Sequence, residues 1–233
     1  MTGVDIRGSQ LYELCQSAIA GMDMLAIKPK SSPSGFEAHG MIDRLADVLK
    51  YVPKSRPDRT TVEEAKDNSA IAFSLFAAWF IVLLAKHLGS NFELRTELNK
   101  NSPHASGFQE LVRGYAVLGE IELIPQEFLV DYYISLRGKL HCPVLTAESE
   151  SQEDGAFHDL SKLLLVNSPR RVYIANVRKG SLADALEKIK AILDQVTASG
   201  VVHTSDQIVL VLYKKTGDSV DLDVYDYDQY RHV

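Results

Sequence analysis

The pattern of apolar and polar positions changes character about halfway along the chain. The amino-terminal half is mainly helical in period, whereas from Glu120 onward strand-like alternation and helical spacing follow one another. The expected helices cover 10–27, 38–49, 60–88, 108–118, 156–166 and 182–196. The expected strands cover 91–98, 128–136, 143–147, 172–177, 208–213 and 220–228. These elements predict an α/β fold with a mixed sheet, in which residues 1–106 form a helical region and residues 107–233 form the mixed α/β core.

The helix expected over 182–196 has the clearest boundaries. Ser181 is a good amino-terminal cap, Asp184 follows it by three residues, and Gly200 lies just past the end. One face of this helix carries a continuous apolar stripe, formed by Leu182, Ala185, Leu186, Ile189, Ile192, Leu193 and Val196. We therefore expect this helix to pack its stripe against the core.

The most apolar window of the chain covers residues 70–85. It is shorter than the roughly 20 residues that a helix needs to cross a bilayer. We expect a helix buried at the centre of the protein or against a partner subunit, and no membrane partner. The amino terminus lacks a basic segment followed by an apolar run, so we expect no secretory signal.

Composition narrows the range of functions. The 233 residues are 45% hydrophobic, as in an ordinary globular protein, and 31 acidic against 25 basic side chains give a net charge of −6. This charge would repel a phosphate backbone unless basic residues cluster locally. With Cys15 and Cys142 as the only cysteines, a disulfide framework and a cysteine-rich zinc site are both excluded, and a reducing cytoplasm is the expected compartment.

Basic residues do cluster at several places. The segment 52–60 carries Lys54, Arg56 and Arg59 close to Lys50, and two prolines make it a connection that is a candidate for phosphate contact. Basic pairs also stand at the ends of expected strands, at Arg170-Arg171, Arg178-Lys179 and Lys214-Lys215. They could meet a phosphate backbone, or they could only balance nearby acids.

A tight hairpin is expected around Gly138, because Gly138 suits the first central position of a type II′ turn. If Gly138 and Lys139 are the two loop residues, Asp131 lies opposite Thr146. This register places Asp131, Glu148 and Glu150 on one face of the sheet. The opposite face then collects Val130, Tyr132, Ile134, Leu136, Leu145 and Ala147, which is a reasonable core surface.

Carboxylates packed side by side repel one another unless a cation, a proton or solvent relieves the repulsion. Mg²⁺ prefers hard oxygen ligands and needs only one or two carboxylates when a substrate phosphate completes its shell. The helix expected over 156–166 places Asp159 and Lys162 three residues apart on one side, so Lys162 could reach back over the carboxylates. The alternative is that Glu148 and Glu150 are only the solvated end of a strand, with no metal.

Asp131, the sequence Glu148-Ser149-Glu150 and the helix with Lys162-Leu163-Leu164-Leu165 together resemble the PD-(D/E)XK restriction-endonuclease-like superfamily. The resemblance covers about residues 108–213. It implies an αβββαβ core, with Asp131 and Glu148 as ligands of Mg²⁺ and Glu150 or Lys162 assisting the attacking water. The usual lysine of the second motif is replaced by Glu150. That replacement is similar to the Glu-X-Glu motif of the BamHI type, and in other members the lysine lies on the following helix, as Lys162 would.

The resemblance implies Mg²⁺-dependent hydrolysis of DNA, with the amino-terminal helices as a DNA-contacting or dimerising appendage. A second hypothesis is a non-catalytic interaction or regulatory subunit that keeps the fold and uses its acidic surface to bind a protein. Other enzyme classes lack support, because the sequence contains no zinc-binding His-Glu-X-X-His, no Gly-rich phosphate loop and no Gly-X-Ser-X-Gly elbow.

Overall fold

The fold is described from a computed structural model. It describes residues 8–23, 35–37, 69–89, 91–96, 121–125, 129–139, 142–150, 156–198, 207–216 and 219–227. Three expectations therefore lie outside the described residues: the helices over 38–49 and 108–118, and the basic segment 52–60.

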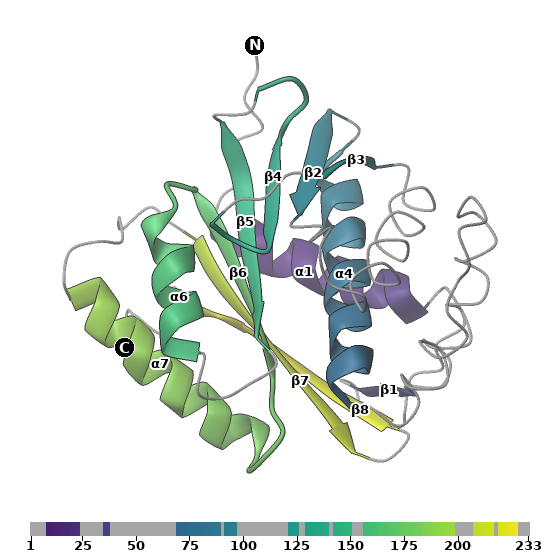
Figure 1. The fold of residues 1–233 in the computed structure, drawn as a ribbon. Helices are drawn as coiled ribbons and strands as arrows, with labels where there is room; N and C mark the ends of the chain where they lie inside the picture. The colour runs from purple at the N-terminus through teal and green to yellow at the C-terminus, as the bar shows by residue number, and fades with distance from the viewer. Residues whose placement is uncertain are drawn as a thin grey trace.

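An eight-stranded mixed sheet forms the centre of the protein (Figure 1), with strand order β1-β8-β7-β6-β5-β4-β2-β3. The strands are β1 (Gly35–Glu37), β2 (Phe92–Thr96), β3 (Glu122–Pro125), β4 (Tyr132–Leu136), β5 (Pro143–Glu150), β6 (Arg170–Asn176), β7 (Gln207–Thr216) and β8 (Ser219–Asp226). Strands β5, β6 and β7 are parallel to one another, and β4 and β8 continue the sheet in antiparallel pairing on either side. The predicted mixed α/β fold is confirmed at this level.

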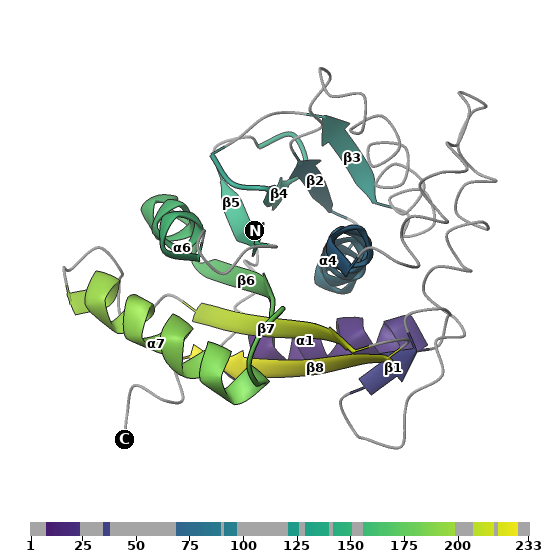
Figure 2. The same ribbon diagram turned by 60° about the horizontal axis from the view of Figure 1, so that its bottom comes forward.

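Helices cover both faces of the sheet. They are α1 (Gly8–Asp23), α4 (Ser69–Leu88), α6 (Ala156–Leu165) and α7 (Leu182–Ala198). Figure 2 looks along α4 and shows the sheet curved around it, with α6 and α7 on the outer face. The two parallel crossovers, β5-α6-β6 and β6-α7-β7, place both of these helices on the same face.

Each face of the sheet buries its own apolar cluster, because successive strand residues point to opposite sides. One cluster joins α1 and α4 to Tyr132, Ile134, Leu145 and Ala147, and the other joins α6 and α7 to Tyr173, Leu210 and their neighbours. Helix α4 belongs to the first cluster, with its residues from Phe76 to Ala85 all buried. Within the described part of the chain, no helix is long and apolar enough to cross a membrane.

Most of the expected elements in the described part are present. The predicted cap of α7 is confirmed: Ser181 Oγ accepts a hydrogen bond from the Asp184 amide, and the Ser181 amide donates to the Asp184 carboxylate. The short edge strands β1 and β3 were not predicted. The proposed boundary between residues 106 and 107 lies outside the described residues, and β1 and β2 from before it pair in the same sheet as the later strands.

From Tyr132 to Ile134 the register of the hairpin differs from the prediction by two residues. Tyr133 pairs with Thr146, where the prediction paired Asp131 with it. Gly138 has φ 72° and stands third in a turn closed by the Lys139 amide and the Leu136 carbonyl, so it is not the first central residue of a two-residue loop. The Cys142 amide also donates a hydrogen bond to the Lys139 carbonyl (3.1 Å). Because the shift is even, the division of side chains between the two faces is preserved, except that Val130 joins the cluster with α6 and α7.

Arg170 and Arg171 were expected to flank a strand, but they are its first two residues and both are buried. Arg171 Nε donates to the Leu163 carbonyl (3.1 Å) and its Nη2 donates to the Val166 carbonyl (2.9 Å). These carbonyls belong to the carboxyl end of α6, where helical partners run out and a cation is favourable. Arg171 therefore holds α6 against the sheet.

Replacing Arg171 with Met should destabilise the protein by about 2 to 4 kcal/mol, because two buried carbonyl groups lose charged donors. The free energy of unfolding in urea measures this loss. Arg178→Met, which changes an exposed arginine just past the same strand, should stay within about 0.5 kcal/mol of the parent. Equal values for the two variants would show that Arg171 does not anchor α6.

Candidate functional site

The candidate site begins with the two glutamates at the end of β5. Glu148 pairs with Tyr173 of β6 and Glu150 pairs with Ala175, so both glutamates point to the face that α6 covers. Glu148 is only 1% exposed. A carboxylate this deeply buried is unusual and needs a partner of opposite charge or a bound proton.

Asp131 stands immediately before β4 and next to this pair of glutamates. Its Oδ2 accepts a hydrogen bond from the Ser149 amide (3.0 Å) and another from the Ser149 hydroxyl (2.9 Å). Since Tyr132 pairs with Ala147, Asp131 is one residue further along the ladder, beside Glu148. Ser149 thus orients the Asp131 carboxylate from between the two glutamates.

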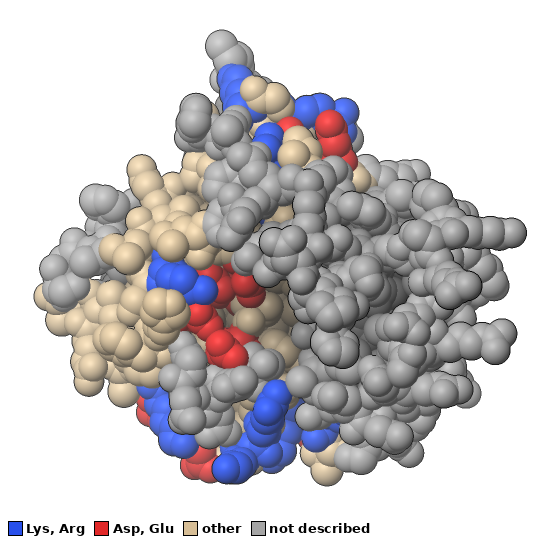
Figure 3. Space-filling view, viewed as in Figure 1, with Lys and Arg blue, Asp and Glu red and all other residues tan. Residues whose placement is uncertain are grey.

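Helix α6 contributes two charged side chains, Asp159 and Lys162, which are three residues apart. Lys162 Nζ lies 2.7 Å from Asp159 Oδ1 and 3.2 Å from Glu148 Oε1. Asp159 also shares a side-chain hydrogen bond with Glu150. Lys162 therefore joins the helix to the strand, and the four carboxylates and one ammonium group form a single cluster. Figure 3 shows acidic side chains gathered in a hollow on this side of the molecule.

Tyr173 lies at the centre of this cluster. Its side chain is fully buried, and its hydroxyl has no hydrogen-bond partner among the described residues. Burial and the charges of Asp159, Glu150, Glu148 and Asp131 all raise the pKa of the Tyr173 hydroxyl, which keeps its proton. The hydroxyl can thus serve as a neutral donor to a ligand in the cluster.

Burial and, to a smaller extent, the nearby Asp131 carboxylate raise the pKa of Glu148 to about 9, because Lys162 opposes these two effects only in part. The opposition is weak because the ammonium group is shared with Asp159, to which it is closer. Burial would also raise the pKa of Asp159, but hydrogen bonds from Glu150 and Lys162 outweigh it and lower that pKa. The pKa of Lys162 is raised despite its partial burial, because both acids stabilise its charge. Near neutral pH we therefore expect Glu148 to hold a proton and Lys162 to be charged.

The donor set has the chemistry that Mg²⁺ requires. Asp131 and Glu148 supply hard oxygen atoms side by side, and Glu148 Oε1, although close to Lys162, makes no well-oriented hydrogen bond within the described part of the chain. No three Asp, Glu, His or Cys side chains of the described residues are arranged to hold a metal ion. Mg²⁺ needs no more than one or two carboxylates, because waters and substrate oxygens complete its shell. The residues present therefore fit a magnesium site built on two carboxylates.

All four residues proposed from the sequence lie in this cluster: Asp131, Glu148, Glu150 and Lys162. Sequence reasoning missed Tyr173 and the role of Ser149. The only signal for Tyr173 was a hydroxyl on the apolar strand Val172–Val177, and nothing in the sequence said that this position faces the carboxylates.

Comparison of the chain with protein-family models, with curated proteins and with solved structures finds no match in any of the three. The function must therefore be inferred from the geometry of these side chains.

The raised pKa of Glu148 predicts a dependence of stability on pH. An ordinary glutamate releases its proton near pH 4, so between about pH 4 and pH 9 the folded chain binds a proton that the unfolded chain has lost. The contribution of Glu148 is largest below this window and is lost as the pH rises through it. Glu148→Gln, which cannot titrate, should therefore gain stability relative to the parent as the pH rises.

Urea unfolding at several pH values across this window measures the difference. Glu187→Gln is the matched control, because Glu187 is exposed on α7. A difference between Glu148→Gln and the parent that does not change with pH would contradict the raised pKa.

Proposed function

We propose that this protein is a metal-dependent endodeoxyribonuclease, which hydrolyses phosphodiester bonds at the cluster of Asp131, Glu148, Glu150 and Lys162. The observation that carries the proposal is the 3.2 Å approach of Lys162 Nζ to Glu148 Oε1. It brings a cation from the following helix to the carboxylates at the end of β5. This is the arrangement implied by the resemblance to the PD-(D/E)XK superfamily when the lysine is missing from the second motif.

The order of elements supports the same proposal. Among the elements that the structure describes, helix α4, strands β2, β4 and β5, helix α6 and strand β6 follow one another as helix, three strands, helix and strand, with the edge strand β3 between β2 and β4 in the chain. The three strands β2, β4 and β5 pair antiparallel, and β6 pairs parallel to β5. An αβββαβ core of this kind would start at α4, earlier in the chain than the predicted start near residue 108.

Asp131 and Glu148 would hold the metal ion. Bound Mg²⁺ supplies Lewis-acid polarisation of the phosphoryl group and lowers the pKa of an attacking water. The proton that Glu148 carries must leave before its oxygen can act as a ligand. Asp159 is well placed to keep Lys162 charged, because the Asp159 Oδ1 and Lys162 Nζ atoms lie 2.7 Å apart.

The remaining residues have roles that follow from their charge and position. The Lys162 ammonium group can stabilise the negative charge that develops on the phosphate oxygens. Glu150 lies beyond Glu148 on the same face and can accept a proton from water at the open end of the strand. Ser149 keeps Asp131 directed toward the glutamates through its two hydrogen bonds.

Asp131→Asn and Glu148→Gln should each reduce Mg²⁺-dependent cleavage of duplex DNA at least about 100-fold, because each removes a charged ligand worth several kcal/mol. Lys162→Met should lower kcat by about 100- to 1,000-fold with a smaller change in KM. Gel assays with Mg²⁺ or Mn²⁺ measure the cleavage, and circular dichroism checks the fold.

Lys190→Met is the matched control for Lys162→Met. Lys190 also pairs with an acid three residues before it, Glu187, on a helix that covers the same sheet face. It should leave cleavage unchanged. A parent protein that cuts neither DNA nor RNA with either metal would overturn the proposal.

One observation favours the alternative of a non-catalytic interaction or regulatory subunit. Lys162 already lies within ion-pair distance of two acids of the cluster, Glu148 and Asp159. Calorimetric titration with Mn²⁺ separates the two functions. Binding heat that disappears in Asp131→Asn supports the nuclease, whereas no binding at any pH up to about 9, where Glu148 loses its proton, supports the interaction subunit.

A further inference from the structure

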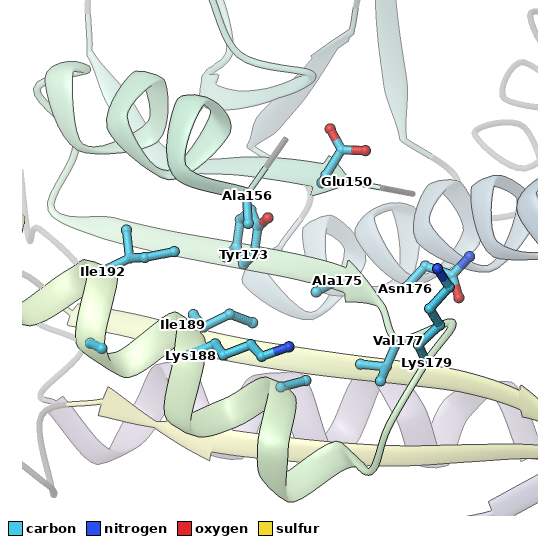
Figure 4. Close-up of a pocket in the computed structure, with 12 residues that line it drawn as sticks. Glu150, Ala156, Tyr173, Ala175, Asn176, Val177, Lys179, Lys188, Ile189 and Ile192 are labelled. Carbon is cyan, nitrogen blue, oxygen red and sulfur yellow. The ribbon is translucent and has the colours of Figure 1, made fainter. Parts of the chain in front are cut away.

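A second feature lies beside the carboxylate cluster. A cavity of about 380 Å³ separates β6 from α7 and extends to the start of α6. This volume lies within the range of roughly 300–1,000 Å³ that is typical of small-molecule sites. Figure 4 shows Ile189 and Ile192 projecting from α7 toward Tyr173 and Ala175 of β6, with Asn176, Val177 and Lys179 at the other end.

The walls of the cavity are mostly apolar and come from a strand and a helix that face each other. Ala175 and Val177 line the strand side, and Ala185, Ile189 and Ile192 line the helix side. The facing surfaces of a strand and a helix suit a planar ring, which can contact aliphatic side chains on both of its sides. The cavity therefore favours a ligand with a flat unsaturated body.

Two buried polar atoms line the same cavity. Asn176 is 3% exposed and Tyr173 is fully buried, yet Asn176 Nδ2 and the Tyr173 hydroxyl have no hydrogen-bond partner among the residues that the structure describes. Leaving a buried donor unpaired is unfavourable, because the group has lost its hydrogen bond to water. Both atoms can donate to ring nitrogen or carbonyl oxygen atoms, so a ligand with such acceptors would remove this cost.

The charges at the rim indicate an anionic group on the ligand. Lys179 and Lys188 both line the cavity, and both are exposed at its edge. Lysine ammonium groups at the mouth of an apolar cavity are suited to bind a phosphate. The cavity is also lined by Glu150 and Tyr173, which belong to the carboxylate cluster as well.

From this geometry we infer that the cavity between β6 and α7 is a nucleotide-binding site, in which a base lies between Ala175 and Ile189 and its phosphate meets Lys179 and Lys188. The choice of a nucleotide rests on the proposed function, because Glu150 joins the cavity to the cluster where a phosphodiester would be cut. The nucleotide can be a unit of the substrate strand next to the cleaved bond or a free mononucleotide. Both share the same chemistry, a planar base with an attached phosphate.

Equilibrium binding to the full-length protein tests the inference, measured in EDTA so that no cleavage takes place. The probes are deoxynucleoside monophosphates, the matching nucleosides, inorganic phosphate and a fluorescent oligonucleotide. Monophosphates should bind at least about tenfold more tightly than inorganic phosphate or the nucleosides, since only they occupy both the apolar and the basic part. Equal affinity of monophosphates and inorganic phosphate would overturn the inference.

Two pairs of variants locate the binding in the cavity. Ala185→Leu fills the cavity from α7 and should weaken monophosphate binding at least about tenfold, whereas Ala183→Leu changes an exposed alanine of the same helix that does not line it. Lys188→Gln should weaken binding about three- to fivefold, and Lys190→Gln, which removes an equal charge from outside the cavity, should not. Unchanged binding in both Ala185→Leu and Lys188→Gln would overturn the inference.

The oligonucleotide separates the two sources of the nucleotide. If Ala185→Leu also weakens oligonucleotide binding, the site holds a unit of the strand; if only monophosphate binding falls, it holds a free nucleotide.

The same measurements separate this inference from the proposed nuclease. Monophosphate binding without any cleavage would contradict the proposed nuclease and support the nucleotide site. Cleavage without monophosphate binding would contradict the nucleotide site alone.

Discussion

The burial of Glu148 beside Asp131 is the constraint on which the rest of this protein depends. A glutamate that is 1% exposed and next to a second carboxylate is stable only if a proton or a cation accompanies it. Both are present: burial favours the protonated form, and Lys162 lies 3.2 Å away. In the proposed nuclease, a metal ion would take the place of the proton on Glu148.

Lys162 can lie beside the buried Glu148 only because α6 is held in place. Arg171 holds the carboxyl end of α6 through the carbonyl groups of Leu163 and Val166, while Leu160, Leu163 and Leu164 bury the helix against the sheet. Asp159 then fixes the lysine side chain from the same helix. A buried arginine at the start of β6 thus supports a lysine that faces β5, and the charged groups on this face of the sheet depend on one another.

The carboxylate cluster and the cavity lie on the same face and share Glu150 and Tyr173. One feature is acidic and suited to a cation, and the other is apolar with lysines at its rim. In the proposed function, the cluster would hold the cation that a phosphate requires, and the cavity would hold the base of a nucleotide. The net charge of −6 does not conflict with this, because Lys179 and Lys188 provide positive charge locally at the cavity.

The sequence determined the elements and the sides of the sheet. Period-two alternation placed Glu148 and Glu150 on one face and Leu145 and Ala147 on the other, and this survived an error of two residues in the hairpin register because an even shift preserves the alternation. The capping residues Ser181 and Asp184 could also be predicted from the sequence, since a helix cap involves only neighbours in the chain. Tertiary structure decided everything that joins distant segments: the burial of Arg171 under α6, the place of Tyr173 among four carboxylates, and the cavity between β6 and α7. Local patterns say which way a side chain points, but only the packing of the whole chain determines what it meets there.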